Sequence, residues 1–376
     1  MLSMKINNLM ASSIEQTQPI LQPYPCFIMR GGTSKGLFFL AEDLPTNTDE
    51  RDRVLLHLMG SPDERQIDGL GGAHPLTSKV AIVSKSTRPD TDVDYLFLQV
   101  VVNKAEVSTT QNCGNILAAV GPFAIEKGLV KATNAVTAVR IHMLNTGANA
   151  VALIETPDGK VNYEGSATID GVPGSAAPVL LDFLDIAGSS CGALFPTGKA
   201  QDVIFDIPVT CVDNGMPVVL LNAASFGLTG AESPAELEQN HALKSKIEAI
   251  RLAAGKLMHL GDVSKQTVPK MSLISPALNG GVVSTRTFIP HRVHDAIGVL
   301  GSVSVATACV LQGTVANDLV QHSFSDGTIS IDVEHPTGLF TIEMTVSGSC
   351  EGIENFAVHR AALLRTARLL MRGEAY

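Results

Sequence analysis

The two halves of the chain resemble each other, and this internal repeat restricts the fold more than any other feature. Each half begins with a glycine turn between two expected strands, at Gly31 in the first half and Gly215 in the second. Further along, segment 78–84 (SKVAIVS) resembles 269–275 (PKMSLIS), and a stretch of small, uncharged residues follows each segment. A repeat of this length predicts two similar α+β domains and not a solenoid.

The length of 376 residues also fits two domains, because one domain commonly has about 100–200 residues. We expect a mobile tail over 1–20, a first domain over 21–196 and a second domain over 197–376, whose last helix packs back on the first domain. The boundary is placed where glycine and proline cluster, at 192–198. Ligands favour the cleft between such domains, so we expect the functional site there.

The charge balance restricts the partners. The chain has 27 Lys and Arg against 37 Asp and Glu, a formal net charge of −10. Nucleic-acid binding needs clustered Lys and Arg, so nucleic acid is excluded as the main partner, whereas a small anion in a local cationic pocket is not. With 45% hydrophobic and 17% charged residues, the chain can bury a large core.

Six cysteines are spread along the chain without a C-x-x-C pair. This spacing predicts reduced thiols in a cytoplasmic protein and neither a zinc site nor a disulfide framework. Residues 1–20 lack the features of a signal peptide. The uncharged stretch 296–317 is long enough to cross a bilayer, but its Gly, Ser, Thr and Gln residues favour a buried helix. We therefore expect no membrane partner.

Short apolar or alternating runs, separated by Gly and Pro, predict most of the strands. These runs are 26–29, 37–40, 80–83, 95–102, 139–143 and 151–154. Helices of small apolar residues are predicted over 115–127 and 302–311, each ended by a glycine. A charged, exposed helix is predicted over 234–257, where Ser233 and Glu236 form a capping box.

Segment 30–36 (RGGTSKG) joins two of these strands. Its GTSKG part matches the G-x-S-x-G elbow of hydrolases, but an elbow needs a helix after the serine, and strand 37–40 follows here. A hydrolase is therefore rejected. The backbone N–H groups of the turn, with Arg30 and Lys35 beside them, predict an anion-binding nest. An ordinary hairpin with solvated basic side chains is the alternative.

The segment Gln111-Asn112-Cys113-Gly114-Asn115 lies directly before the first small-residue helix. The unpaired N–H groups of a helix start favour a cysteine thiolate and a bound carboxylate. Gly114 lets a ligand approach the backbone closely, and Asn112 or Asn115 can cap the helix. A buried structural cysteine is the alternative interpretation.

Lys79 stands at the head of the apolar run 80–83. Uncharged surroundings favour the neutral amine that can act as a base, and a lysine that reaches water from a strand end is the alternative. Arg286 and His291 precede the second small-residue helix, where they face the same cleft or have structural roles. Segment 291–294 (HRVH) lacks the glutamate and the spacing of H-E-x-x-H, so no catalytic metal is expected.

Several motifs, in one order from about residue 24 to about residue 367, resemble the 2-methylaconitate cis-trans isomerase (PrpF-like) family. They are segments 29–36, 58–63, 65–69, 76–79, 111–115, 213–219 and 288–292. The resemblance implies an α+β fold similar to that of diaminopimelate epimerase, with two pseudo-symmetric domains. Each domain wraps a curved sheet or barrel around a central helix, and the substrate lies between the two helix N-termini. The resemblance implies no cofactor and no metal.

The resemblance also implies which residues act. Diaminopimelate epimerase uses one cysteine from each domain, and Cys113 matches the first of them. The second predicted helix begins at Gly301-Ser302 and has no cysteine there, so a two-thiol mechanism is not expected. The family's allylic isomerases use a lysine and the remaining cysteine, which Lys79 and Cys113 match.

The implied function is a cofactor-independent isomerase or tautomerase that moves a proton on the tricarboxylic acid 4-oxalomesaconate, in the breakdown of aromatic compounds such as gallate. Isomerisation of aconitate, 2-methylaconitate or methylitaconate is one alternative, and a non-catalytic carboxylate-binding protein is another. The oligomeric state stays open, with a homodimer as one option. Substrate-binding residues are expected at Arg30, Thr33, Ser34, Lys35, Ser78, Gln111, Asn112, Gly114, Asn115, Arg286, His291, Ser302, Val303 and Ser304.

Overall fold

The computed structural model describes residues 22–109, 113–184, 186–290, 292–321, 323–348 and 352–376. The tail expected over 1–20 lies outside these residues. Within the described part of the chain, no helix has both the length and the apolar character needed to cross a membrane.

The described elements are mostly strands, with six α-helices. The strands of the first half are β1 (Tyr24–Gly31), β2 (Ser34–Leu40), β3 (Lys79–Lys85), β4 (Val93–Val100), β5 (Val107–Ser108), β6 (Ala135–Met143), β7 (Asn149–Thr156) and β8 (Pro178–Leu184). Those of the second half are β9 (Asp202–Ile204), β10 (Ile207–Asp213), β11 (Pro217–Asn222), β12 (Lys270–Pro276), β13 (Val283–Phe288), β14 (Gly327–His335), β15 (Gly338–Ser347) and β16 (Ala357–Ala375). The helices are α1 (Thr48–Met59), α2 (Gly114–Leu117), α3 (Val120–Glu126), α4 (Pro234–Gln239), α5 (His241–Leu257) and α6 (Val299–Val310).

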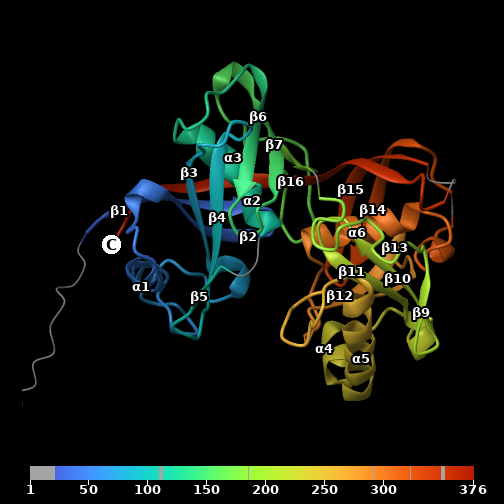
Figure 1. Cartoon of the computed structure of the whole chain (residues 1–376). Coiled ribbons are helices and arrows are strands. Elements are labelled where there is room, and N and C mark those ends of the chain that lie inside the picture. The colour runs from blue at the N-terminus through green and yellow to red at the C-terminus, as the bar shows by residue number, and fades with distance from the viewer. Residues whose placement is uncertain (1–21, 110–112, 185, 291, 322, 349–351) are drawn as a thin grey trace, which may run out of the picture.

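Strand β16 joins the two halves. Its first part pairs with β15 of the second half and β8 of the first half, and its last part pairs with β1. The sheet of the first half therefore closes on itself, in the order β1-β2-β3-β4-β6-β7-β8-β16. In Figure 1 the two halves lie side by side, β16 extends across both, and the C-terminus ends beside β1.

The second half repeats the pairing pattern of the first. The pairs β2–β3 and β4–β6 are parallel, and so are β11–β12 and β13–β14. A parallel pair needs a crossover connection, which usually contains a helix. The corresponding crossovers carry α1 and α4–α5 in the first position, and α2–α3 and α6 in the second. This topology agrees with the repeat seen in the sequence, whereas the boundary at residue 196 stays a prediction.

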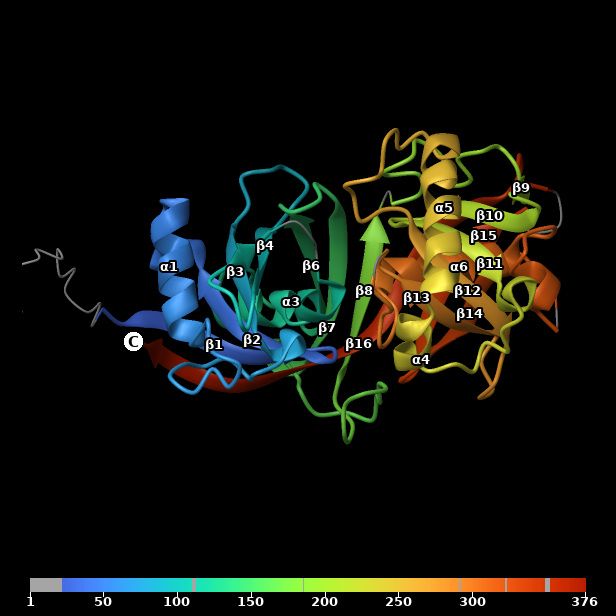
Figure 2. The ribbon, with the colours of Figure 1, turned by 90° about the horizontal axis from the view of Figure 1, so that it is seen from below.

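The two kinds of crossover helix lie on opposite faces of the sheet. Helices α2, α3 and α6 contribute to one large apolar core, together with the inward side chains of both halves. Helix α1 packs on the outer face of the first half, and α5 packs on the outer face of the second. Figure 2 shows α1 and α5 outside the sheets they cover. The central position of α6 agrees with the prediction that stretch 296–317 contains a buried helix.

Two predicted helices are interrupted in the structure. The helix predicted over 115–127 is two short helices, α2 and α3, with a turn after Ala118. Pro122 has no N–H group to donate to the carbonyl of Ala118, so a continuous helix cannot form there. The helix predicted over 234–257 is interrupted at Asn240, whose side chain caps the start of α5.

Two further predictions of helices were wrong in position or type. The second central helix begins at Val299, three residues before the predicted start at Ser302. The expected last helix is absent from the described residues, because segment 357–375 is strand β16. This segment is rich in Ala, Leu and Arg, which favour a helix in isolation. Strand pairing along both edges overrides that preference.

Candidate active site

The glycine turn between β1 and β2 lies directly on the start of α2. A Cβ atom added to Gly31 would meet the backbone carbonyl of Asn115, and one added to Gly32 would meet the Asn115 side chain. Gly32 also has a positive φ of 50°. The amide of Gly32 donates to the carbonyl of Thr366 at 2.9 Å. The turn is therefore held between α2 and β16, and its predicted role as an anion-binding nest stays a prediction.

Arg30 stabilises this turn. Its Nη1 atom donates to the carbonyl of Gly32 at 2.8 Å and to the hydroxyl of Thr366 at 3.0 Å. Burial and the nearby charge of Arg368 lower the pKa of Arg30. These contacts show that Arg30 holds the turn in place, and its predicted role in binding substrate stays a prediction.

Ser34 and Lys79 lie near each other on the inner face of the first half. Strands β2 and β3 are parallel, and Gly36 pairs with Lys79. A Cβ atom added to Gly36 would meet the Lys79 carbonyl, so the strands approach closely there. Ser34 is buried, and its Oγ atom has no hydrogen-bond partner among the described residues.

Lys79 has uncharged neighbours. It is 6% exposed, and its Nζ atom donates to the side-chain oxygen of Gln99 at 3.0 Å. The Nζ atom also lies 5.0 Å from the centre of the Phe97 ring. Among the described residues, no carboxylate forms an ion pair with Lys79. This arrangement orients the amine through a neutral amide, as a proton-transferring lysine requires.

Cys113 is the N-cap residue of α2 and is half-buried. It lies close to Tyr95, the residue two positions before Phe97 on β4. Burial first, and the neighbouring Cys113 second, raise the pKa of Tyr95 well above its usual value. Strand β4 thus links the two predicted catalytic residues, with Lys79 at Phe97 and Cys113 at Tyr95. Because α2 is only four residues long, its dipole at Cys113 is weaker than the predicted longer helix would give.

The N-terminal ends of α2 and α6 meet between the two halves. Gly114 is the first residue of α2, and Val299 is the first residue of α6. A Cβ atom added to Gly114 would lie 2.9 Å from the Cβ atom of Val299. Both helix starts thus point into the same region, as the resemblance implied. Amides of the first turn of a helix have no acceptor within the helix and can bind an anion.

The predicted binding amides on α6 were wrong. The helix is capped by Gly298, and the amide of Ser302 donates to the Gly298 carbonyl at 2.9 Å. Ser302 and Val303 therefore lie inside the helix, and the amides without a helical acceptor belong to its first three residues. Ser304 is fully buried, and its hydroxyl donates to the carbonyl of Met216 at 2.7 Å. Its side chain holds the turn between β10 and β11 and does not face a ligand.

Two other predicted ligands have structural roles. Arg286 lies on the face of β13 that the outer helices cover, and its Nε atom donates to the carbonyl of Glu232 at 2.5 Å. Ser78 is fully buried, donates to a backbone carbonyl at 2.8 Å and accepts a hydrogen bond from Gln66 at 2.8 Å. Both side chains are thus held by hydrogen bonds within the chain, and their predicted contacts with substrate stay predictions.

Other predicted residues surround the glycine turn. Thr33 lies beside the loop at Gly171, and its amide is 3.5 Å from the side-chain oxygen of Asn115. Lys35 is half-buried and extends toward Gly72. The predictions for Gln111, Asn112 and His291 lie outside the described residues.

Lys270 occupies the position in the second half that Lys79 occupies in the first. It is the first residue of β12 and pairs with Val218 on the parallel strand β11. Its Nζ atom donates to the carbonyl of Thr267 at 2.6 Å. Burial and the charge of Arg251 lower the pKa of Lys270 to about 8.

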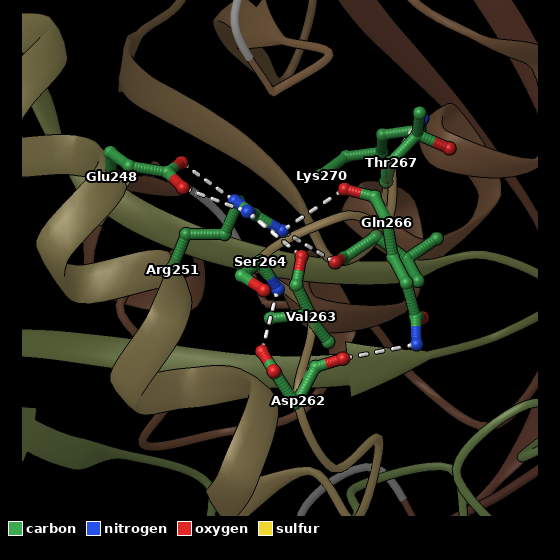
Figure 3. Close-up of polar contacts among 9 residues, drawn as sticks. Glu248, Arg251, Asp262, Val263, Ser264, Gln266, Thr267 and Lys270 are labelled. Carbon is green, nitrogen blue, oxygen red and sulfur yellow. Dashed lines mark hydrogen bonds and ion pairs between the residues drawn. The ribbon is translucent and has the colours of Figure 1, made fainter.

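Arg251 organises the loop that precedes Lys270. The Arg251 side chain is fully buried on α5 and forms an ion pair with Glu248 at 2.7 Å. It also donates to the carbonyls of Val263, at 3.0 Å, and Val268, at 2.8 Å. Figure 3 shows these contacts, with Lys270 bonded to the same loop. These contacts hold Lys270 against a backbone carbonyl of its own half, whereas Lys79 is oriented by the side-chain amide of Gln99.

Sequence reasoning did not predict a role for His294, His335 or Arg365. His294 lies between the halves: burial, and then the charges of Lys270 and Lys79, lower its pKa, while Asp295 raises it. The Nδ1 atom of His294 accepts the amide of Ala296 at 2.9 Å, which leaves its Nε2 atom as the donor. His335 and Arg365 belong to no recognisable motif, and the fold brings both near His294, at the end of segment 291–294.

The chain is similar to known proteins in both sequence and fold. The family described as PrpF protein matches residues 22–376. The chain belongs to this family. It is 57% identical to 4-oxalomesaconate tautomerase from Pseudomonas putida, over 93% of this chain and 94% of that protein. It is also 57% identical to (4E)-oxalomesaconate Delta-isomerase from a Novosphingobium species, over 94% of this chain and 97% of that protein.

Solved structures confirm the expected fold class. The crystal structure of methylitaconate-delta-isomerase superimposes with a TM-score of 0.80 at 37% identity, covering 94% of this chain and 95% of that one. A hydroxyproline epimerase from Agrobacterium vitis has the same fold, with a TM-score of 0.53 at 14% identity, over 95% and 94% of the chains. This PrpF chain therefore has the α+β, epimerase-like architecture that the resemblance implied.

Proposed function

We propose that this chain is an isomerase that moves a proton on 4-oxalomesaconate, by a keto-enol or a 1,3-allylic shift. The observation that carries the proposal is the placement of both predicted catalytic residues beside one stretch of β4, with Lys79 next to Phe97 and Cys113 next to Tyr95. The starts of α2 and α6 meet beside Cys113. The relatives named for 4-oxalomesaconate support the choice of substrate, because each aligns with more than nine-tenths of the chain.

The proposed mechanism begins with proton removal by Lys79. Its amine, oriented by Gln99, takes a proton from a carbon that is α to a carbonyl or conjugated with one. The electron pair of the broken C–H bond moves into the conjugated system and forms an enolate. The thiol of Cys113 then donates a proton at the other end of that system, which leaves an ammonium and a thiolate. Transfer of one proton between these two groups, directly or through solvent, restores the starting enzyme.

The helix starts stabilise the negative charge in this proposal. The first-turn amides of α2 and α6 point into one region, where they can hold carboxylates and the enolate oxygen. Ser34 adds a buried hydroxyl next to the glycine turn, which packs on the start of α2. Because an enolate carries more charge on oxygen than the substrate does, these donors favour the transition state over the ground state.

A panel of unsaturated acids tests the function. Purified protein is incubated with 4-oxalomesaconate, cis-aconitate, trans-aconitate, 2-methylaconitate and methylitaconate, and each reaction is followed by ultraviolet absorbance and proton NMR. We expect the largest kcat/KM for 4-oxalomesaconate. Methylitaconate is the second candidate, because the solved methylitaconate-delta-isomerase has the TM-score of 0.80. Turnover of another acid alone would contradict the proposed substrate, and binding without isomerisation of any acid would identify a non-catalytic carboxylate-binding protein.

Other expectations remain proposals. A cofactor-independent reaction, a cytoplasmic location, a role in the breakdown of aromatic compounds and a homodimeric assembly rest on the sequence and the resemblance. The comparisons support a small organic acid as the substrate of the relatives, and we extend this class to the present chain.

A further inference from the structure

We infer that Arg365, on β16, binds one carboxylate of the substrate through the Nε–Nη2 edge of its guanidinium group. This inference rests on the proposed function, because it names a binding residue for the same acidic substrate. The observation behind it is a buried cation whose hydrogen-bonding edge has no protein acceptor.

The Arg365 side chain is 3% exposed, and only some of its hydrogen-bond donors have acceptors among the described residues. The Nη1 atom donates to the carbonyl of Leu364 at 2.8 Å. The flat face of the guanidinium stacks on Phe340, with 3.9 Å from its central carbon to the ring centre. The buried Nε and Nη2 atoms have no hydrogen-bond partner among the described residues. These two atoms form the side of an arginine that binds both oxygens of one carboxylate.

A buried guanidinium without an acceptor is costly. Buried charges in proteins are almost always paired, because the lost hydration must be replaced by hydrogen bonds. Burial lowers the pKa of Arg365 to about 10, in agreement with a charge that lacks a counterion. Two other arginines of this strand differ, since Arg360 pairs with Asp182 and Arg372 pairs with Glu126. A ligand carboxylate supplies the missing acceptor for Arg365.

His335 provides a second unused donor next to Arg365. The edge of its ring packs on Phe340 at 4.8 Å between ring centres, so both side chains contact the same aromatic ring. Its Nδ1 atom accepts the amide of Thr337 at 3.3 Å, which places the ring hydrogen on Nε2. That Nε2 atom is buried and has no partner among the described residues. Burial is the main cause that lowers the pKa of His335 to about 4, so the ring is neutral.

Strand register places Arg365 on the inner face of the second half. Leu363 pairs with Ile342 in the core, and Arg365 lies two residues further on the same face. Phe340, on which Arg365 stacks, belongs to the core that also contains Val299, the first residue of α6. Arg365 is therefore on the side of the sheet that carries the central helix.

The neighbours of Arg365 connect it to the proposed catalytic groups. The next residue, Thr366, accepts the amide of Gly32 from the turn that lies on α2. On the other side, the charge of Arg365 acts on His335, as does that of His294. His294 in turn lies so close to Lys79 that the charge of Lys79 lowers the pKa of His294. A carboxylate on Arg365 thus belongs to a ligand that extends toward Lys79 and the helix starts.

The enclosure of this edge predicts movement on binding. Neither Nε nor Nη2 is reached by solvent, so a ligand contacts them only when the surrounding groups part. The segment around Asp170 lies near His335, the neighbour of Arg365. The carboxylate of Asp170 accepts the amide of Leu339, one residue before Phe340, and its charge acts on His335.

The test compares Arg365→Met and Arg365→Lys with the control Arg372→Met on the same strand. Calorimetry measures binding of tricarballylate, a saturated tricarboxylate that cannot be isomerised, and kinetics give KM and kcat for 4-oxalomesaconate. We expect Arg365→Met to weaken binding and raise KM by about tenfold to a hundredfold, because charged hydrogen bonds are lost. Arg365→Lys keeps the charge without the two-atom edge and should recover only part of this loss. The control should bind and react like the original protein.

Thermal unfolding separates a binding role from a structural one. Removing an unpaired buried charge should leave the melting temperature of the ligand-free protein unchanged or higher. Unchanged tricarballylate binding and unchanged KM in Arg365→Met would overturn the inference, whether or not the melting temperature falls. If the original protein binds tricarballylate through Arg365 but isomerises no acid, the proposed function fails and the binding role of Arg365 stands. If it binds tricarballylate and loses nothing in Arg365→Met, the binding role fails alone. If it neither binds tricarballylate nor isomerises any acid, both fail.

Discussion

At the residue scale, the candidate site contains buried polar groups that lack the partners such groups usually have. Lys79 is buried with a neutral amide partner, and Arg365 is buried with an unused edge. Ser34 and His335 add donor groups that have no partner within the described chain. Such groups are rare in folded proteins because each unpaired polar atom lowers stability. In the proposed function, a bound ligand completes these hydrogen bonds.

His335 gives a prediction about pH. In the unfolded chain a histidine takes up a proton near pH 6.5, whereas His335 in the folded protein does so only near pH 4. Between these values the unfolded state binds one more proton, so the folded protein loses stability as pH falls from about 6.5 to about 4. The groups that act on its ring are Asp170, which raises the pKa, and Arg365, His294 and Arg286, which lower it after burial.

The variant His335→Gln should reduce this loss by up to about 1.4 kcal/mol for each pH unit in the interval. Urea unfolding at several pH values between 4 and 7 measures the effect. The exposed His241 provides the control, as His241→Gln should leave the pH dependence unchanged. Identical pH profiles for the original protein and His335→Gln would contradict the assignment.

The sequence made some of these residues recognisable and not others. Lys79, Cys113 and the glycine turn lie in motifs whose residue types suggest chemistry without a structure. Arg365 lies in a run of Ala, Leu and Arg that suggests a solvated face. Its burial depends on Phe340 from another strand, and no local pattern contains that information. The position of Arg286 on the outer face of β13 was not predictable either, because strand register decides which face a side chain occupies.

At the element scale, the main feature is the meeting of α2 and α6. The first residues of these helices, Gly114 and Val299, come from different halves of the chain and pack against each other. Each helix follows a strand and returns to a parallel strand, so its start lies at the corresponding end of its own half. The pseudo-symmetric topology therefore brings together two sets of amides that neither half has alone.

The variant Gly114→Ala should disturb this contact. The added methyl group would lie 2.9 Å from the Val299 side chain, closer than such atoms approach, so the helix starts must shift apart. A displacement of about 1 Å at a reacting centre can reduce the rate about a hundredfold, so we expect a kcat loss of up to that size. Steady-state kinetics on 4-oxalomesaconate measure the change.

A compensating change makes this prediction specific. The double variant Gly114→Ala with Val299→Ala removes the clash and should recover most of the lost kcat, while Val299→Ala alone should have a small effect. Equal activity for Gly114→Ala and the original protein would show that the distance between the helix starts does not matter for the reaction. So would a double variant no better than Gly114→Ala.

Element boundaries show what the pattern of residues could predict. Alternating apolar runs predicted strands that the structure contains, and the capping box of Ser233 and Glu236 is present at the start of α4. The start of α6 was misplaced because stretch 296–317 is small and uncharged throughout, so nothing in it marks the first turn. Gly298, a weaker capping residue than Ser or Asp, occupies the N-cap.

At the scale of the whole molecule, β16 makes the two halves depend on each other. The strand completes the sheet of the first half and also pairs with β15 of the second half. Arg365 and Thr366 both lie on this shared strand. The repeat in the sequence predicted two similar units, and the pairing pattern agrees with it. The sharing of a final strand was not predictable, since residues 357–375 pair with partners that lie far away in the chain.

The central claim is that Lys79 and Cys113 transfer the proton in this family member. Proton NMR in deuterated buffer tests it most directly, by following isomerisation of 4-oxalomesaconate and deuterium incorporation at each carbon. The variants are Lys79→Met and Cys113→Ser, and the control is Lys85→Met, at the exposed opposite end of the same strand. We expect Lys79→Met to reduce both processes by about 10²- to 10⁴-fold, with the melting temperature and the rate of the control preserved.

For Cys113→Ser, we expect a large fall in product formation, while deuterium exchange at the carbon that Lys79 deprotonates continues more rapidly than product formation. The contradicting result is Lys79→Met with the isomerisation rate of the original protein, or Cys113→Ser with an unchanged rate and full labelling of the product.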